Sequence, residues 1–175
     1  MSPKREVLYE GKYLRLVRQG TWEFAERKNT SGVVAVVPIT DQGELVLVEQ
    51  FRVPTGTRVI ELCAGLAGDI QGQEDEALEQ AAQRELEEET GFRAGSMEAV
   101  LNGPSSSGSS SAHITLFVAR GLQRVGPGGG DAGEDISVHV VPLAQVESFL
   151  KAQQALGKSV DPKIFAGLWF ARGSF

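Results

Sequence analysis

The stretch Arg84-Glu85-Leu86-Glu87-Glu88-Glu89-Thr90-Gly91-Phe92 decides how the chain is interpreted, because it combines a dense run of glutamates with helical spacing. Residues 74–90 have the apolar spacing of an α-helix, and Gly91 is the residue type that commonly follows the last helical position. The stretch therefore predicts a helix over 74–90 whose last turns are rich in carboxylates.

A helical wheel divides the acids of this helix into two groups. The apolar stripe is formed by Leu78, Ala81, Ala82 and Leu86. At about 100° per residue, Glu85 and Glu89 fall inside that stripe and Glu88 falls at its edge. The acids expected on the opposite side, as ordinary surface residues, are Glu76, Glu79 and Glu87. The spacing thus predicts that Glu85, Glu88 and Glu89 converge on the body of the protein.

The charge of the chain is concentrated in this region. Its net charge is −6, whereas residues 69–89 hold nine acids and one base, Arg84, and so carry −8. A solvated acidic helix face is one explanation. However, clustered and partly desolvated carboxylates repel one another unless a cation is present, and Mg²⁺ takes oxygen ligands while keeping waters for substrate phosphates. The wheel favours a cation site, with Arg84 either holding a carboxylate in place or making a surface ion pair worth about 0–1 kcal/mol.

One set of residues resembles the signature of the Nudix hydrolases, and it consists of Glu76, a gap of seven residues and the stretch 84–92. That signature reads Gly, five residues, Glu, seven residues, then Arg-Glu-apolar-any-Glu-Glu-any-Gly-apolar. Ile70 stands where the signature has its Gly, and the equivalent is Gly65, five residues further upstream. We interpret this as a five-residue insertion in the loop before the helix.

The resemblance extends to the branch that cleaves ADP-ribose and related nucleoside diphosphate sugars. It is carried by residues 46–52, 59–66, 133–136, 138–140 and 161–169. Two positions depart from that branch. Ser107 stands before Gly108 where those enzymes usually have Pro, and Ala112 stands where several relatives have Glu. The substrate is therefore less closely defined than the family.

The resemblance implies a fold and an activity. The fold is α+β, a Nudix α/β/α sandwich around a mixed β-sheet with an N-terminal β-hairpin extension. Residues 1–30 would supply N-terminal strands for dimerisation and the substrate pocket, and residues 31–175 the Nudix hydrolase domain. The reaction is Mg²⁺-dependent hydrolysis of ADP-ribose or a related sugar, with Mn²⁺ as a substitute, in a homodimer. The alternatives are another nucleotide sugar such as GDP-mannose, and a non-catalytic Nudix module that senses a nucleotide.

The same resemblance assigns residues to the reaction. Glu85 and Glu89 are the first expected metal ligands, Glu88 is the next, and the carbonyl oxygen of Ala64 is a further one. Glu134 is the expected general base, since it follows a glycine-rich segment that would let it move, and Glu88 is the alternative base. Arg84 would hold a carboxylate of the site.

Four side chains are candidates for substrate contact. Arg52 has the planar fork that suits a phosphate or ribose oxygen, although such an arginine also makes surface pairs. Glu61 would either hold a sugar hydroxyl or pair with Arg58, itself a candidate for substrate binding. Trp22 would stack on a base, although aromatic residues at alternating strand positions more often belong to a core.

The remaining pattern consists mainly of strands. We expect a hairpin from 7–17 and 21–27, a second hairpin from 32–39 and 44–51 with a turn at Asp41-Gln42-Gly43, and later strands at 58–62, 97–101, 113–120 and 136–141. Helices are expected at 143–156 and 162–171, the latter with Asp161 as N-cap. The serine-rich segment 105–111 and the glycine-rich segment 126–130 are either flexible linkers or functional loops.

Composition excludes several classes. An apolar fraction of 41% is typical of a globular protein. The sequence has no run of 18 or more apolar residues, which is the length needed to span a membrane. The net charge of −6 argues against nucleic-acid binding. The N-terminus is polar and Cys63 is the only cysteine, which excludes an internal disulfide. We therefore expect a cytoplasmic protein without a membrane or nucleic-acid partner.

Overall fold

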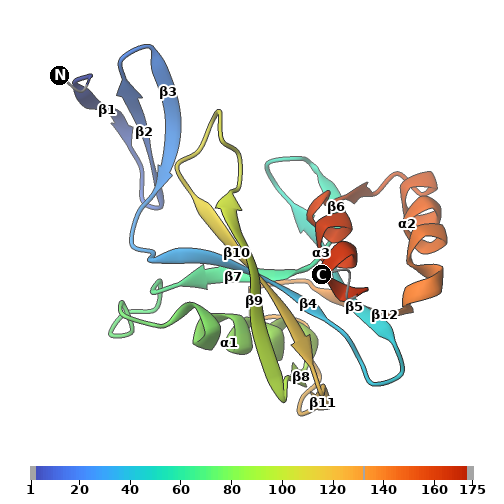
Figure 1. Ribbon diagram of the computed structural model, residues 1–175. Coiled ribbons are helices and arrows are strands. Elements are labelled where there is room, and N and C mark those ends of the chain that lie inside the picture. The colour runs from blue at the N-terminus through green and yellow to red at the C-terminus, as the bar shows by residue number, and fades with distance from the viewer. Residues whose placement is uncertain (1–2, 132, 173–175) are drawn as a thin grey trace.

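The computed structural model describes residues 3–131 and 133–172, and it contains a layered body from which an N-terminal sheet projects (Figure 1). Two four-stranded sheets form the middle of the body. Helix α1 (Leu78–Thr90) covers one side, and α2 (Val146–Ala155) and α3 (Lys163–Ala171) lie on the other. Within the described residues, no helix is both long and apolar enough to cross a membrane.

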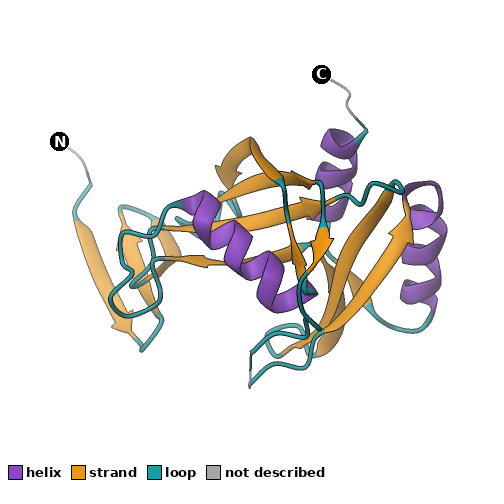
Figure 2. Cartoon of the chain, turned by 90° about the horizontal axis from the view of Figure 1, so that it is seen from below, coloured by secondary structure: helices purple, strands orange, loops and turns teal. Residues whose placement is uncertain are grey.

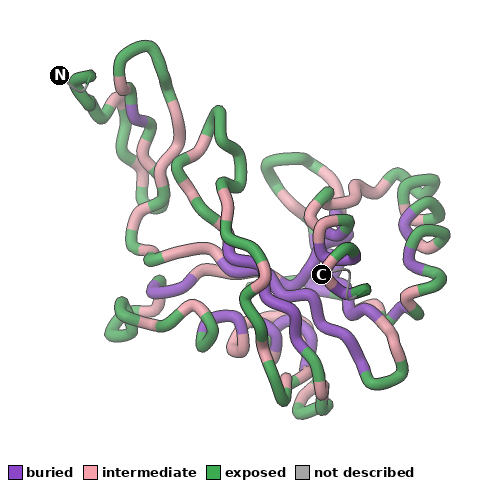
Figure 3. Tube along the Cα trace, in the orientation of Figure 1, coloured by how far each residue is buried: buried purple, intermediate pink, exposed green. Residues whose placement is uncertain are grey.

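The projecting sheet consists of β1 (Arg5–Glu10), β2 (Leu14–Gln19) and β3 (Trp22–Arg27), all antiparallel. The expected single strand over 7–17 is wrong, because the chain turns between β1 and β2, where the Gly11 N–H donates to the Leu14 carbonyl at 2.8 Å. The extension is therefore a three-stranded sheet rather than a hairpin. Figure 3 shows that most of it is exposed, with a small buried part at Val17.

The first central sheet has the order β7-β4-β10-β9. Its strands are β4 (Gly32–Pro38), β7 (Cys63–Ala67), β9 (Ser96–Pro104) and β10 (His113–Arg120). β4 pairs parallel with β10 and antiparallel with β7, so the sheet is mixed. A small ladder of β8 (Phe92–Arg93) and β11 (Gln123–Arg124) lies beside it.

The second central sheet has the order β12-β5-β6-β13. Its strands are β5 (Glu44–Arg52), β6 (Thr57–Glu61), β12 (Ser137–Pro142) and β13 (Ser159–Val160). The expected hairpin of 32–39 with 44–51 forms only at its turn, where Ile39 pairs with Leu45. Beyond that pair the two strands enter different sheets, where β4 pairs with β7 and β10, and β5 pairs with β6 and β12.

The buried residues form two clusters, one on each side of the sheets. The first joins α2 and α3 to residues such as Ala35, Val37 and Leu47, and the second joins α1 to Val34, Val36 and Val48. Neighbouring residues of β4 thus point alternately into the two clusters, as the period of a strand requires. Figure 2 shows α1 lying across the strands. This confirms the predicted α+β sandwich of helix, mixed sheet and helix.

The helices differ from the sequence prediction mainly at their starts. α1 begins at Leu78 rather than at residue 74, and it ends as expected at Gly91, whose φ is 74°. A 3₁₀ turn (Leu143–Gln145) precedes α2. At the start of α3 the Asp161 carboxylate accepts a hydrogen bond from the Lys163 N–H at 2.8 Å, which is a capping contact.

Candidate active site

The C-terminal half of α1 packs against β7, and this contact brings two glutamates onto a strand backbone. Glu89 is 3% exposed, and one of its oxygens accepts a hydrogen bond from the Ala64 N–H at 3.2 Å. The carboxyl group of Glu85 lies so close to Gly65 that a Cβ atom there would overlap it. Glu88 lies further out, with a side chain 48% exposed. The predicted convergence of the three is therefore close for Glu85 and Glu89 and looser for Glu88.

Burial makes the carboxylates of Glu85 and Glu89 unusually basic. Desolvation, together with the charges of Glu85 and Glu134, raises the pKa of Glu89 to about 8 against the favourable Ala64 N–H and Cys63 side chain. Desolvation also raises the pKa of Glu85, to which Glu88 and Asp69 contribute, while Arg84 acts in the opposite direction. The described protein groups thus stabilise the charged forms of Glu85 and Glu89 less well than water does, and a cation would favour their ionisation.

Arg84 organises the outer part of this site. It donates from Nη1 to Glu85 at 2.8 Å and to Glu88 at 3.1 Å, and from Nη2 to the Leu66 carbonyl at 2.9 Å. Its Nε and Nη2 also contact the two oxygens of Glu76, at 3.0 and 3.2 Å. Arg84 therefore ties the helix to the end of β7 and to the loop before the helix.

Glu76 is the main acid that the helical wheel misplaced. It was expected at the surface, but its side chain is 6% exposed and also accepts a hydrogen bond from the Gly68 N–H at 3.3 Å. The wheel does not apply to Glu76, because α1 starts only at Leu78. The signal that could have identified it is its place in the Nudix signature.

The glycine-rich segment 126–130 is fixed to the end of α1 by its backbone. The Gly129 N–H donates to the Glu89 carbonyl at 2.8 Å, and the Gly130 N–H donates to the Glu88 carbonyl at 3.0 Å. A flexible linker is therefore wrong for this segment, since it caps the helix. Glu134 follows it as an exposed residue whose carboxylate accepts a hydrogen bond from the Asp131 N–H at 3.2 Å. Its charge contributes to the raised pKa of both Glu89 and Arg52.

Arg52 and Glu61 form a two-point ion pair across the β5–β6 hairpin. Nε of Arg52 lies 2.6 Å from Oε1 of Glu61, and Nη2 lies 3.1 Å from Oε2. The suggested pair of Glu61 with Arg58 is wrong, because their side chains point to different neighbours. Arg58 instead contacts Glu49 and Asp135, at 2.6 and 2.9 Å. Arg52 remains 39% exposed, so its outer edge is open to a ligand.

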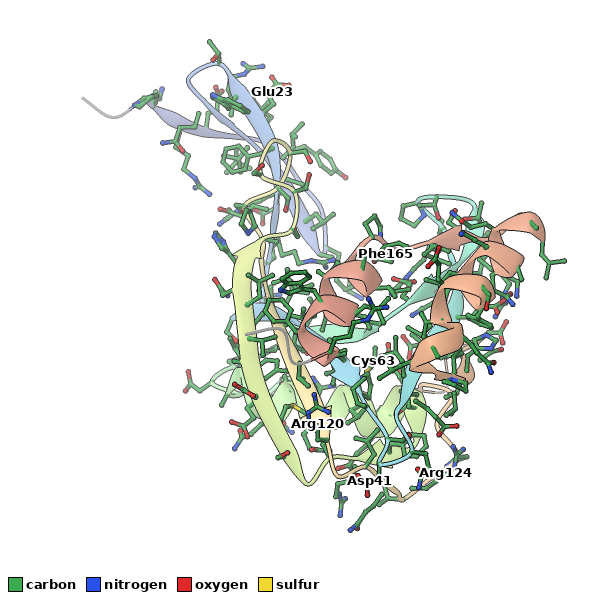
Figure 4. The ribbon with its side chains drawn as sticks, turned by 45° about the vertical axis from the view of Figure 1, so that its right-hand side comes forward. Glu23, Asp41, Cys63, Arg120, Arg124 and Phe165 are labelled. Atoms are coloured by element: carbon green, nitrogen blue, oxygen red, sulfur yellow. The ribbon has the colours of Figure 1, made fainter. Side chains whose placement is uncertain are left out.

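Trp22 lies far from the carboxylates within one chain. It is 62% exposed on β3 and borders a cavity of about 330 Å³ together with Phe24, Ser107 and Gly108. Figure 4 shows its neighbour Glu23 at the tip of the projecting sheet, whereas Cys63, which precedes Ala64, lies inside the body. A single chain therefore does not bring Trp22 to the helix.

The serine-rich segment 105–111 is also anchored rather than free. The Ala25 N–H donates to the Ser109 carbonyl at 2.8 Å, and the Ser111 N–H donates to the Ala25 carbonyl at 3.1 Å. The tip of the β9–β10 hairpin thus contacts β3, beside the projecting N-terminal sheet (Figure 1).

The donor set at α1 fits a hard divalent cation. Two oxygen-bearing side chains with raised pKa face a strand backbone that carries no side chain at Gly65, and carboxylate and carbonyl oxygens are the ligands that Mg²⁺ prefers. Across residues 3–131 and 133–172, however, no three His, Cys, Asp or Glu side chains are already arranged as a ligand set. Arg84 contacts both Glu85 and Glu88, so a cation would have to share or replace those contacts.

The layered fold and the carboxylate-bearing helix define a class of protein, and comparison with known proteins identifies it. The model of the NUDIX domain matches residues 29–163, and the chain belongs to this family. It is a Nudix hydrolase, as the sequence predicted, and the family implies a divalent metal ion.

Two relatives and one solved structure illustrate the similarity. The chain is 30% identical over 158 residues to the methanol dehydrogenase activator of Bacillus methanolicus, covering 86% of this chain and 83% of that protein. It is 31% identical over 124 residues to an ADP-ribose pyrophosphatase of Bacillus subtilis, covering 67% of this chain and 64% of that protein. A crystal structure of an ADP compounds hydrolase superposes with a TM-score of 0.71 at 22% identity, covering 99% of this chain and 94% of that chain, which supports the fold.

Proposed function

We propose that the protein hydrolyses the diphosphate bond of ADP-ribose or a related nucleoside diphosphate sugar with the help of Mg²⁺, and that Mn²⁺ can replace it. The observation that carries this proposal is the pair Glu85 and Glu89, buried against the backbone of Ala64 and Gly65 with raised pKa values. An isolated buried carboxylate costs several kcal/mol, so retaining two of them favours a cation-dependent enzyme over a module that only senses a nucleotide.

We assign the metal to the carboxylates of Glu85, Glu89 and Glu88 and to the carbonyl oxygen of Ala64. When bound, the ion would neutralise the diphosphate and lower the pKa of a water at the phosphorus. Arg84 would orient Glu85 and Glu88, to which it already donates hydrogen bonds.

Glu134 would take the proton from the attacking water. The water oxygen bonds to phosphorus, the phosphorus–oxygen bond of the anhydride breaks, and the leaving phosphate keeps the bond's electron pair. ADP-ribose and water would thus give AMP and ribose 5-phosphate. The charge of Glu134 already influences Glu89 and Arg52, which supports its place beside the diphosphate.

Arg52 and Glu61 are our candidates for contact with the substrate. The open edge of Arg52 would bind a phosphate or ribose oxygen, and Glu61 would hold its guanidinium at the correct angle. Trp22 would stack on the base in the pocket of the second subunit of a homodimer, since its neighbour Glu23 lies at the tip of the projecting sheet, away from Cys63 in the body. Residues 1–30 would then pair the subunits, and residues 31–175 would form the hydrolase domain of a cytoplasmic enzyme. Residues 1–2, 132 and 173–175 lie outside the described structure.

A panel of nucleotides tests this function. The protein would be incubated with Mg²⁺ and ADP-ribose, GDP-mannose or other nucleoside diphosphate sugars, and phosphate would be measured after added phosphatase. We expect the fastest release from ADP-ribose. Faster release from GDP-mannose would support the alternative substrate, and binding without turnover of any diphosphate would support the sensing module.

A further inference from the structure

An ion pair joins β6 to the residue that follows Glu134. Nη1 of Arg58 lies 2.9 Å from Oδ2 of Asp135, and Nη2 donates to the Asp135 carbonyl at 3.3 Å. The contact therefore holds both the side chain and the backbone of Asp135. Because the Asp135 side chain is 85% exposed, this part of the network is open to solvent.

The other side of Arg58 is firmly anchored. Its Nε donates to Glu49 at 2.6 Å, and the second oxygen of Glu49 accepts from Lys158 at 2.7 Å and His139 at 2.9 Å. Burial acts to raise the pKa of Glu49, but the hydrogen bonds from Lys158, His139 and Arg58 together lower it to about 2. Glu49 is therefore charged at neutral pH and gives Arg58 a fixed partner from β5.

The backbone before Glu134 is anchored as well. Gly129 and Gly130 are bonded to the last turn of α1, as described above, and Ile136 is buried in the cluster beneath that helix. Asp135, between Glu134 and buried Ile136, is held by Arg58 of β6. Between these anchors the Glu134 carboxylate lies against Gly130, whose N–H is bonded to the Glu88 carbonyl, and its charge acts on Glu89 and Arg52.

We propose that Arg58 is a positioning residue, which holds Glu134 at the carboxylate site through its contacts with Asp135. This role rests on the proposed function, in which Glu134 takes part in turnover. It replaces the expectation that Arg58 binds substrate, because Nε, Nη1 and Nη2 of Arg58 all have acceptors within the protein.

A double-mutant cycle tests this positioning role. Arg58→Ala and Asp135→Ala should each lower kcat by about tenfold with KM nearly unchanged, since small misplacement of a reacting group is costly. The double variant should be no slower than the slower single variant, because Arg58→Ala already removes the side-chain contact that Asp135→Ala removes, together with the contact to the Asp135 carbonyl. Asp135→Asn keeps an acceptor oxygen for Arg58 and should recover most of the activity.

A matched control separates this effect from the loss of any surface arginine pair. Arg93 of β8 makes a two-point ion pair with Glu87 of α1, at 2.7 and 2.8 Å, which involves neither Glu134 nor Asp135. Arg93→Ala should leave kcat and KM unchanged. Arg58→Ala also removes a partner of buried Glu49 and should lower the melting temperature. Asp135→Ala carries the test if Arg58→Ala does not fold.

A second measurement does not depend on activity. Hydrogen exchange of the amides of residues 133–136 without substrate should become faster in Arg58→Ala and Asp135→Ala, and stay unchanged in Arg93→Ala. Unchanged exchange, or a tenfold rise in KM in Arg58→Ala that Asp135→Ala does not share, would overturn the proposal. If exchange responds but Glu134→Gln has full activity, the positioning contact stands and the assignment of Glu134 as the base fails instead.

Discussion

The carboxyl group of Glu85 occupies the space that a Cβ atom on Gly65 would need. Helix α1 thus brings this side chain onto the backbone of β7 at a residue without a side chain of its own. The Ala64 N–H, one residue earlier, is bonded to Glu89. The arrangement of both acids therefore depends on the smallest residue of β7, which leads to the first prediction.

Gly65→Ala should retain the fold and lose most of the activity. The new methyl group would displace the end of a flexible side chain rather than the helix, so we expect native circular dichroism. We expect kcat to fall by about 10²-fold, which is the scale that a 1 Å misplacement reaches. Gly103→Ala is the control, because a Cβ atom at Gly103 meets nothing within 4 Å. Equal activity of the two variants would show that the position of Glu85 is unimportant.

Removal of metal should abolish activity. It should also reveal that the buried carboxylates lower the free energy of unfolding in a pH-dependent way. The folded pKa of Glu89 is about 8 against an ordinary value of 4.5, so between these values the folded state binds more protons than the unfolded state. In EDTA the free energy of unfolding should therefore fall as pH rises from 4.5 to about 8. Chemical denaturation at a series of pH values measures this dependence.

Glu89→Gln removes the group responsible and should flatten that dependence. At pH 8 without metal the variant should melt higher than the native protein, by about 2–4 °C for each kcal/mol of relieved repulsion, and it should not turn over substrate. Glu85→Gln should also abolish turnover. Full activity of either variant would remove the metal assignment, whereas an unchanged pH dependence in Glu89→Gln would mean that another group titrates.

Glu134→Gln should lower kcat by about 10²- to 10⁴-fold, the usual contribution of a general base, with much smaller changes in KM and metal affinity. The residue is exposed, so the free energy of unfolding should change by no more than about 0.5 kcal/mol. Asp135→Asn is the comparison and should be only mildly impaired. The reverse ranking would place the base one residue later, and two silent variants would make Glu88 the leading candidate.

Light scattering at micromolar concentration should give twice the chain mass of 18.7 kDa. Within such a homodimer Trp22→Ala should raise KM by about tenfold or more, since stacking on a base contributes about 1–3 kcal/mol. Trp169→Ala is the control, because Trp169 is exposed to a similar degree, 57% against 62%, but lies on α3. A monomer with full turnover would exclude a pocket completed by a second subunit.

The sequence was most informative where one element could be judged by itself. Helical spacing placed Glu85 and Glu89 on the buried side of α1, and Gly91 ended the helix as expected. Contacts between distant segments were harder to predict. The wheel misplaced Glu76 because the chain before Leu78 folds back as a loop, and helix geometry contains no information about that loop.

Strand pairing was predicted less well for a similar reason. Residues 32–39 and 44–51 looked like a hairpin, but beyond Ile39 and Leu45 each pairs with at least one strand that is distant in the sequence, which a local pattern does not reveal. β7 was missed because Ala64 and Gly65 have weak strand propensity. The anchoring of segments 105–111 and 126–130 was also invisible, since it depends on backbone hydrogen bonds that no composition records.

The crossover of the chain at Leu62 determines where the sequence can tolerate an insertion. This buried residue alone separates the end of β6 at Glu61 from the start of β7 at Cys63, so the chain passes directly from one sheet to the other. An inserted residue there would shift Glu61 out of step with Ala64 and should not be tolerated. The exposed turn at residues 53–56, by contrast, can vary in length next to Arg52 without disturbing α1. Under the proposed function, a change in this turn would alter the surroundings of Arg52 and leave Glu85 and Glu89 in place against β7.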